Sequence, residues 1–125
     1  MARAHTILVV DDDRDLLELI DVVLQREGYL VATATSGRDA LEAVAQAMPD
    51  LILLDLKMPV MDGWEFARTF HARYAATPPI VVFTAADVDQ DCVAEIGAAG
   101  SLSKPFELDE LLATVNRWVG GSHPG

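Results

Sequence analysis

The sequence predicts an α/β domain in which a doubly wound, five-stranded parallel sheet is covered by helices on both faces. Five short apolar segments alternate with longer segments whose apolar residues recur at helical spacing. The strand segments are apolar throughout, which is typical of parallel strands buried on both sides. Reactive residue types follow several of these segments, and ligands of such sheets bind at the carboxyl ends of the strands.

The first two strand–helix units are marked by clear end signals. His5–Val10 is predicted to be a buried strand, and Asp13 is a suitable N-cap for the helix that follows. Gly28 ends that helix, Tyr29–Ala34 forms the second strand, and Ser36 caps the second helix. One face of the first helix carries five apolar residues: Leu16, Leu17, Ile20, Val23 and Leu24.

The third and fourth strands are the most strongly apolar. Leu51–Leu54 is the third strand, and after the Met58-Pro59 turn Asp62 begins a helix that carries Phe66, Ala67 and Phe70 on one side. Pro78-Pro79 interrupts that helix before the fourth strand, Ile80–Phe83.

The last part of the chain carries weaker signals. A short helix is expected to start at Asp87 or Asp89, and a short fifth strand is expected at Ser101–Ser103. Apolar residues then recur at helical spacing: Leu108, Leu111, Leu112, Val115 and Val119. We expect residues 1–119 to form one domain and residues 120–125 (GGSHPG) to be a flexible tail or linker.

Composition limits the function classes. The chain has 125 residues, enough for one domain with a substantial core, and no apolar run long enough to span a membrane. A net charge of -11 disfavours direct binding to nucleic acid or to an anionic membrane. The single cysteine, Cys92, excludes an internal disulfide framework and suits a cytoplasmic location.

Four strand ends carry polar groups that would meet at one edge of the sheet. Asp11 and Asp12 follow the first strand, Asp55 the third, Thr84 the fourth and Lys104 the fifth. Carboxylates that converge must protonate or share a cation, and Mg²⁺ with oxygen ligands suits such a group. A metal, an amine and a hydroxyl are what an incoming phosphoryl group requires, with Asp55 as the nucleophile.

The segments VVDDD, LLDLKMPVMDG, FTA and SKPF resemble, in this order, the motifs of response-regulator receiver domains, the CheY-like family of two-component signalling. The resemblance covers about residues 5 to 119. It implies a flavodoxin-like fold with strand order 2-1-3-4-5. It also implies a signalling phosphoacceptor rather than an enzyme with a separate substrate. A sensor histidine kinase or a histidine phosphotransfer protein would supply the phosphoryl group to Asp55.

The resemblance also implies roles for individual residues. Asp12, Asp55 and the backbone carbonyl of Lys57 match the groups that hold Mg²⁺, and Asp11 is similar to the neighbouring acid of that pocket. Thr84 and Lys104 match the residues that contact the phosphoryl oxygens and report their arrival. The face near the last two helices would be the output surface, with a phosphorylation-dependent dimer as one possible form of output.

Ser101 departs from the family pattern, since relatives usually carry an aromatic residue three positions before the lysine. We therefore expect either a weaker switch or another route through the loop after Thr84. The departure also leaves open a binding module that has lost the chemistry.

A haloacid-dehalogenase-type hydrolase is disfavoured, because the place of its second acid is taken by Lys57. His5, His71 and His123 have no spacing typical of a metal site or a phosphodonor.

Overall fold

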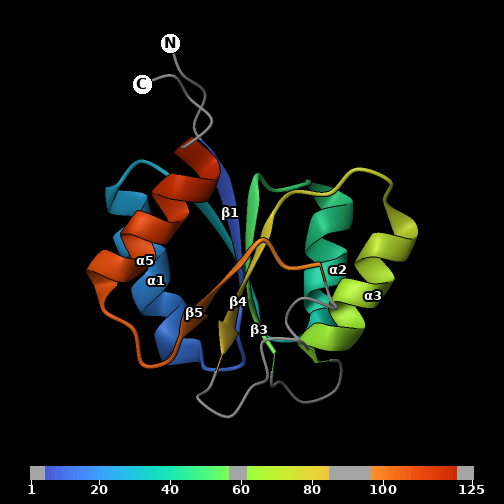
Figure 1. Ribbon diagram of the computed structural model, residues 1–125, viewed down its shortest axis with the longest axis horizontal. Helices are drawn as coiled ribbons and strands as arrows, with labels where there is room; N and C mark the ends of the chain where they lie inside the picture. The colour runs from blue at the N-terminus through green and yellow to red at the C-terminus, as the bar shows by residue number, and fades with distance from the viewer. Residues whose placement is uncertain (1–4, 57–61, 85–96, 121–125) are drawn as a thin grey trace.

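A computed structural model of the chain describes residues 5–56, 62–84 and 97–120. Its centre is a five-stranded sheet of order β2-β1-β3-β4-β5 in which every pair is parallel (Figure 1). The strands are β1 Thr6–Val10, β2 Leu30–Ala34, β3 Leu51–Asp55, β4 Ile80–Thr84 and β5 Gly100–Ser103. The predicted fold class and strand order are therefore confirmed.

Helices cover both faces of this sheet. The described helices are α1 Arg14–Arg26, α2 Gly37–Gln46, α3 Gly63–Arg73 and α5 Leu108–Val115. Helices α1 and α5 lie on one face, and α2 and α3 lie on the other (Figure 1). The short helix expected after Asp87 or Asp89 lies outside the described residues. Within the described residues, no helix is long and apolar enough to cross a membrane.

The helix starts predicted at Asp13, Ser36 and Asp62 are confirmed, and the start at Asp87 or Asp89 lies outside the described residues. The side chain of Asp13 accepts hydrogen bonds from the backbone of α1, Ser36 accepts one from Asp39 N, and Asp62 accepts one from Glu65 N. Each cap satisfies a backbone N–H that has no partner within its own helix. After α1, Gly28 adopts a φ of 92°, a left-handed conformation that favours glycine.

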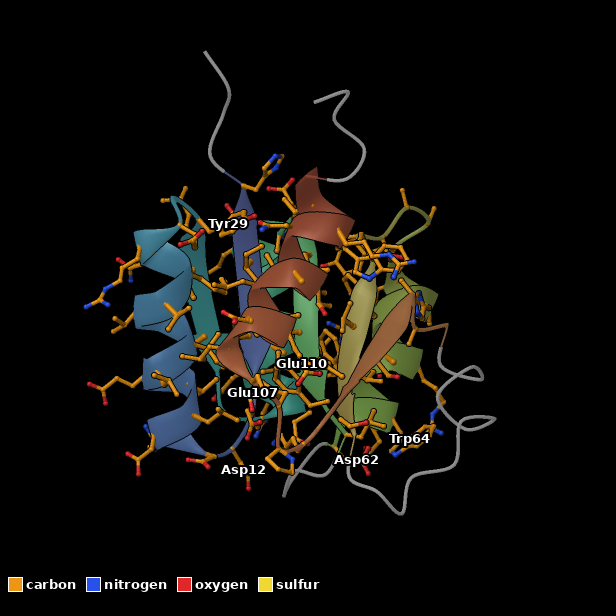
Figure 2. The ribbon with its side chains drawn as sticks, turned by 60° about the vertical axis from the view of Figure 1, so that its left-hand side comes forward. Asp12, Tyr29, Asp62, Trp64, Glu107 and Glu110 are labelled. Atoms are coloured by element: carbon orange, nitrogen blue, oxygen red, sulfur yellow. The ribbon has the colours of Figure 1, made fainter. Side chains whose placement is uncertain are left out.

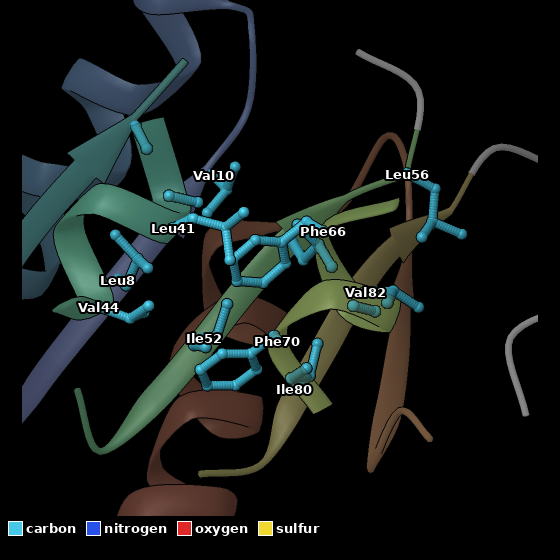
Figure 3. Packing of buried hydrophobic residues seen from close by; sticks show 14 residues of the cluster. Leu8, Val10, Leu41, Val44, Ile52, Leu56, Phe66, Phe70, Ile80 and Val82 are labelled. Carbon is cyan, nitrogen blue, oxygen red and sulfur yellow. The ribbon is translucent and has the colours of Figure 1, made fainter. Parts of the chain in front are cut away.

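Two hydrophobic layers lie on opposite faces of the sheet, because the side chains of each strand alternate between the faces. Ile52 of β3 faces α2 and α3 and packs with Phe66 and Phe70 (Figure 3), and Leu54 belongs to the same cluster. The other layer lies beneath α1 and α5 and contains Phe83. With both faces covered, β3 is buried over its whole length, and the acid at its end is held by a rigid element.

The end of the last helix differs from the expectation of uniform helical spacing. Helix α5 ends at Val115 and continues as a π-helical turn, Asn116–Gly120. A Cβ placed on Gly100 of β5 would lie 3.3 Å from Nε1 of Trp118, so the wider turn brings this indole against the strand. Residues 121–125 lie outside the described part, and the division into a domain and a tail remains a prediction.

Candidate functional site

The ends of β1 and β3 bring three predicted acidic residues together. Val10 of β1 pairs with Leu54 of β3, so that Asp11 and Asp12 follow β1 at the level where β3 ends in Asp55. One ligand oxygen from each of these three carboxylates lies within 4.8 Å of the others. Asp12 is exposed at this end of the sheet, which is the lower end in Figure 2. The structure thus groups residues that are up to 44 positions apart in the sequence.

Lys104, directly after β5, reaches into this acidic group. Its Nζ lies 2.7 Å from Oδ2 of Asp11, to which it donates a hydrogen bond, and 3.7 Å from Oδ2 of Asp55. The ammonium also lies 5.5 Å from the centre of the Phe83 ring, within range of a cation–π contact. The lysine is therefore held between two carboxylates and an aromatic face.

Burial strengthens these interactions. The Asp11 side chain is 1% exposed, that of Asp55 is 10% exposed and that of Lys104 is 31% exposed. Burial by itself lowers the pKa of Lys104, but the hydrogen bond with Asp11 and the charges of Asp11, Asp55 and Asp12 outweigh it. The pKa of Lys104 therefore lies above its ordinary value, and the lysine is positively charged at neutral pH.

Both carboxylate oxygens of Asp11 are engaged within the protein. Oδ2 accepts from Lys104, and Oδ1 accepts a hydrogen bond of 2.9 Å from the backbone N–H of Asp13. Asp13 itself points its carboxylate at the first turn of α1. Asp11 is thus suited to orient Lys104, while Asp12 and Asp55 offer the carboxylates better placed to bind a cation.

The donor set fits Mg²⁺. Three carboxyl groups face one ammonium, so that the acidic groups outnumber the basic one by two in a small, partly buried volume. Such an excess is unfavourable without a cation, and hard carboxylate oxygens are the ligands that Mg²⁺ prefers.

An apolar groove adjoins the site between α1 and the segment after β5. It has a volume of about 440 Å³ and is lined by Asp13, Leu16, Leu19, Lys104, Pro105, Phe106 and Leu108. Leu19 and Leu108 are exposed there. The Phe106 ring stacks on Phe83 at 5.2 Å, which connects the groove to the ring beneath Lys104.

The other predicted positions are described only in part. Thr84 ends β4 opposite Ser103, at the same edge as Asp55, but its side chain lies outside the described residues. Lys57 lies outside them altogether. Ser101 is exposed on β5, and the Lys104-Pro105 bond, which the sequence left open, is cis. Sequence reasoning missed the role of Phe83, because a phenylalanine in an apolar strand carries no signal beyond burial.

Residues 7–116 match a family model described as the response regulator receiver domain. Among solved structures, the chemotaxis protein CheY4 of Vibrio cholerae is 34% identical with a TM-score of 0.83, and the match covers 93% of this chain and 99% of that one. The receiver domain of a signal transduction histidine kinase from Syntrophus aciditrophicus is 29% identical with a TM-score of 0.86, covering 98% and 95%.

A third similar structure contains a metal. The receiver domain of the sensor histidine kinase PA1611 from Pseudomonas aeruginosa PAO1 has a magnesium ion coordinated in its active-site cleft. It is 30% identical to this chain with a TM-score of 0.84, and the match covers 94% of this chain and 99% of that one.

Proposed function

Because this chain belongs to the response-regulator receiver domains of two-component signalling, we propose that it accepts a phosphoryl group on Asp55. The observation that carries the proposal is the position of Asp55. It lies at the end of a fully buried central strand, 3.7 Å from the Lys104 ammonium and among the carboxylates of Asp11 and Asp12. A sensor histidine kinase or a histidine phosphotransfer protein would be the donor, in a cytoplasmic setting.

In the proposed transfer, a carboxylate oxygen of Asp55 attacks the phosphorus atom of a phosphohistidine. The new O–P bond forms as the P–N bond breaks, and the electron pair of that bond remains on the imidazole nitrogen, which takes up a proton.

Bound Mg²⁺ would supply positive charge to the phosphoryl oxygens. Asp12, Asp55 and the backbone carbonyl of Lys57 would hold it, supported by Asp11. The Lys104 ammonium and the Thr84 hydroxyl would contact the transferred group. The domain thereby promotes its own phosphorylation and dephosphorylation.

Lys104 offers the first step of a switch. A phosphoryl group on Asp55 competes with Asp11 for the ammonium, which now makes its shorter contact with Asp11. Reversing a population from 1:99 to 99:1 requires about 5.5 kcal/mol. Hydrogen bonds to charged groups contribute roughly 1.5–3 kcal/mol each, so a few of them suffice. The change would be transmitted to the face near the last two helices, with dimerisation as one form of output.

The apolar groove provides a surface for the phosphodonor. It opens beside Lys104 and exposes Leu19 and Leu108, which suits a partner with an apolar surface around its phosphohistidine. Contact there would place the donor beside Lys104, whose Nζ lies 3.7 Å from Oδ2 of Asp55.

Incubation with acetyl phosphate and Mg²⁺, followed by intact-mass measurement, tests the proposal. We expect one phosphate adduct on the wild-type protein and complete loss of it in Asp55→Asn. The matched control is Asp50→Asn, which makes the same change just before the start of β3 and should keep the adduct.

Two other outcomes would identify other functions. A wild-type protein that takes no phosphate from any donor would be a binding module, which Ser101 leaves open. A protein that releases phosphate from free esters with multiple turnovers would be a hydrolase.

A further inference from the structure

Gly63, the first residue of α3, lies directly against the peptide that joins Asp55 to Leu56. A Cβ placed on Gly63 would lie 2.5 Å from the backbone oxygen of Asp55, a distance that real Cβ atoms essentially never show. It would also lie 2.9 Å from Cα of Leu56 and 3.1 Å from its Cδ2. The backbone N–H of Gly63 donates a hydrogen bond of 3.2 Å to the carbonyl of Leu56, which fixes the approach.

We propose that Gly63 is a positioning residue that sets the place of the Asp55 carboxylate, an inference that rests on the proposed function of Asp55. The two nearest contacts of the added Cβ are backbone atoms, which cannot rotate away as a flexible side chain can. Any side chain at position 63 must therefore displace either α3 or the end of β3.

We expect the last residue of β3 to shift more than α3 does. Helix α3 is anchored by Phe66 and Phe70, which are fully buried and stack on each other at 5.3 Å. Asp55 pairs with Phe83 of β4, but the pairing of β3 with β1 stops one residue earlier, at Leu54. Asp55 is thus the last residue of its strand and lies beyond the register with β1, whereas the helix is held by packed aromatic rings.

A displacement of Asp55 would change its distances to the neighbouring residues of the site. The Asp55 carboxylate shares a cluster of less than 5 Å with Asp11 and Asp12 and lies 3.7 Å from Lys104. Placement errors of about 1 Å can lower reaction rates by on the order of a hundredfold. A methyl group at position 63 should therefore weaken cation binding and slow phosphorylation, although it removes no polar group.

The experiment compares Gly63→Ala with Gly28→Ala. Gly28 has a φ of 92° and nothing within 4 Å of an added Cβ, so its substitution strains the backbone at the end of α1 without a steric clash. Both variants should lose stability. Only Gly63→Ala should lower the Mg²⁺ affinity measured by calorimetry, and the rate of phosphorylation at saturating Mg²⁺, by about tenfold or more. Equal values in the two variants would overturn the proposal.

A second variant identifies the origin of the effect. Leu56→Ala removes the side-chain contact at 3.1 Å but keeps the backbone contact at 2.5 Å, so adding it to Gly63→Ala should restore neither affinity nor rate. Restoration would assign the effect to side-chain packing and overturn the proposal.

A separate measurement covers the case in which Gly63→Ala folds poorly. The measurements are repeated in trimethylamine N-oxide, which favours the compact state. A variant that stays unfolded there would make the contact a requirement of folding and would also overturn the proposal. A wild-type protein that binds Mg²⁺ but takes no phosphate would reject the proposed function alone, because the comparison of Mg²⁺ affinities still tests the role of Gly63.

Discussion

The two ends of the sheet use their aspartates in opposite ways. At the carboxyl end, Asp11, Asp12 and Asp55 are crowded together with one lysine. At the amino end, just before β3, Oδ2 of Asp50 accepts a hydrogen bond of 2.8 Å from the backbone N–H of Thr6. The first group accumulates negative charge, whereas the second satisfies a backbone donor.

Other polar contacts at the amino end have the same character. The hydroxyl of Tyr29 donates a hydrogen bond to Asn116, which joins the start of β2 to the end of α5. Figure 2 shows Tyr29 and Asp12 at opposite ends of the molecule. The polar contacts at the amino end therefore stabilise the fold. The carboxyl end keeps an excess of negative charge, which is available for chemistry but lowers the stability of the folded protein.

The largest expected effect concerns Mg²⁺ and Asp12. At 100 times its dissociation constant, Mg²⁺ should raise the free energy of unfolding of the wild-type protein by about 2.7 kcal/mol. Asp12→Asn should lose most of this gain. Without Mg²⁺ the same variant should be more stable than the wild type, because a repelling charge has been removed. Urea denaturation with EDTA and with Mg²⁺ measures both signs.

Asp13→Asn is the matched control for this prediction. It removes the same charge from the adjacent residue, and asparagine caps a helix as well as aspartate does. The Mg²⁺ effect should therefore be kept. An equal Mg²⁺ gain in Asp12→Asn and the wild type would contradict the distinction between the two ends.

The next effect concerns Asp50. Asp50→Ala should lower the free energy of unfolding by about 1.5 kcal/mol, the lower end for a hydrogen bond to a charged group, because the carboxylate is partly exposed. Urea denaturation measures this loss, and the gain from Mg²⁺ should be unchanged. A variant as stable as the wild type would show that this end of the sheet does not depend on the contact with Thr6.

The smallest effect concerns Tyr29. Tyr29→Phe removes the hydrogen bond to Asn116 and should cost about 1 kcal/mol at pH 7. Burial, and then the charge of Glu27, raise the pKa of Tyr29, so the folded protein holds this proton more tightly than the unfolded chain. The contribution is fully present below the unfolded pKa of about 10 and is lost as the pH rises through the folded pKa. Urea denaturation at pH 7 and pH 11 should show the difference between wild type and variant shrinking; a constant difference would contradict this.

Most of the fold could be predicted because its signals are local. Asp13, Ser36 and Asp62 each stand at a helix start, where a short oxygen side chain is the best partner for backbone N–H groups. The π-helical turn after Val115 could not be predicted, since the regular spacing of Leu111, Val115 and Val119 fits an uninterrupted α-helix.

For the site, the sequence indicated which residues meet but not how they divide their contacts. Asp11 and Asp12 are equivalent in the text VVDDD, yet one is buried against Lys104 and the other is exposed. Successive side chains point in opposite directions along the extended chain after β1, which leaves Asp11 buried and Asp12 exposed. The ring of Phe83 beneath Lys104 likewise follows from three-dimensional packing, which no spacing rule contains.

The sheet that carries the site also acts as a partition. Its backbone separates the layer under α2 and α3 from the layer under α1 and α5, and among the described residues the two buried clusters have no member in common. Energetic effects of such distant changes usually add. Amino-acid substitutions in one layer can therefore accumulate without requiring compensating substitutions in the layer beneath Lys104.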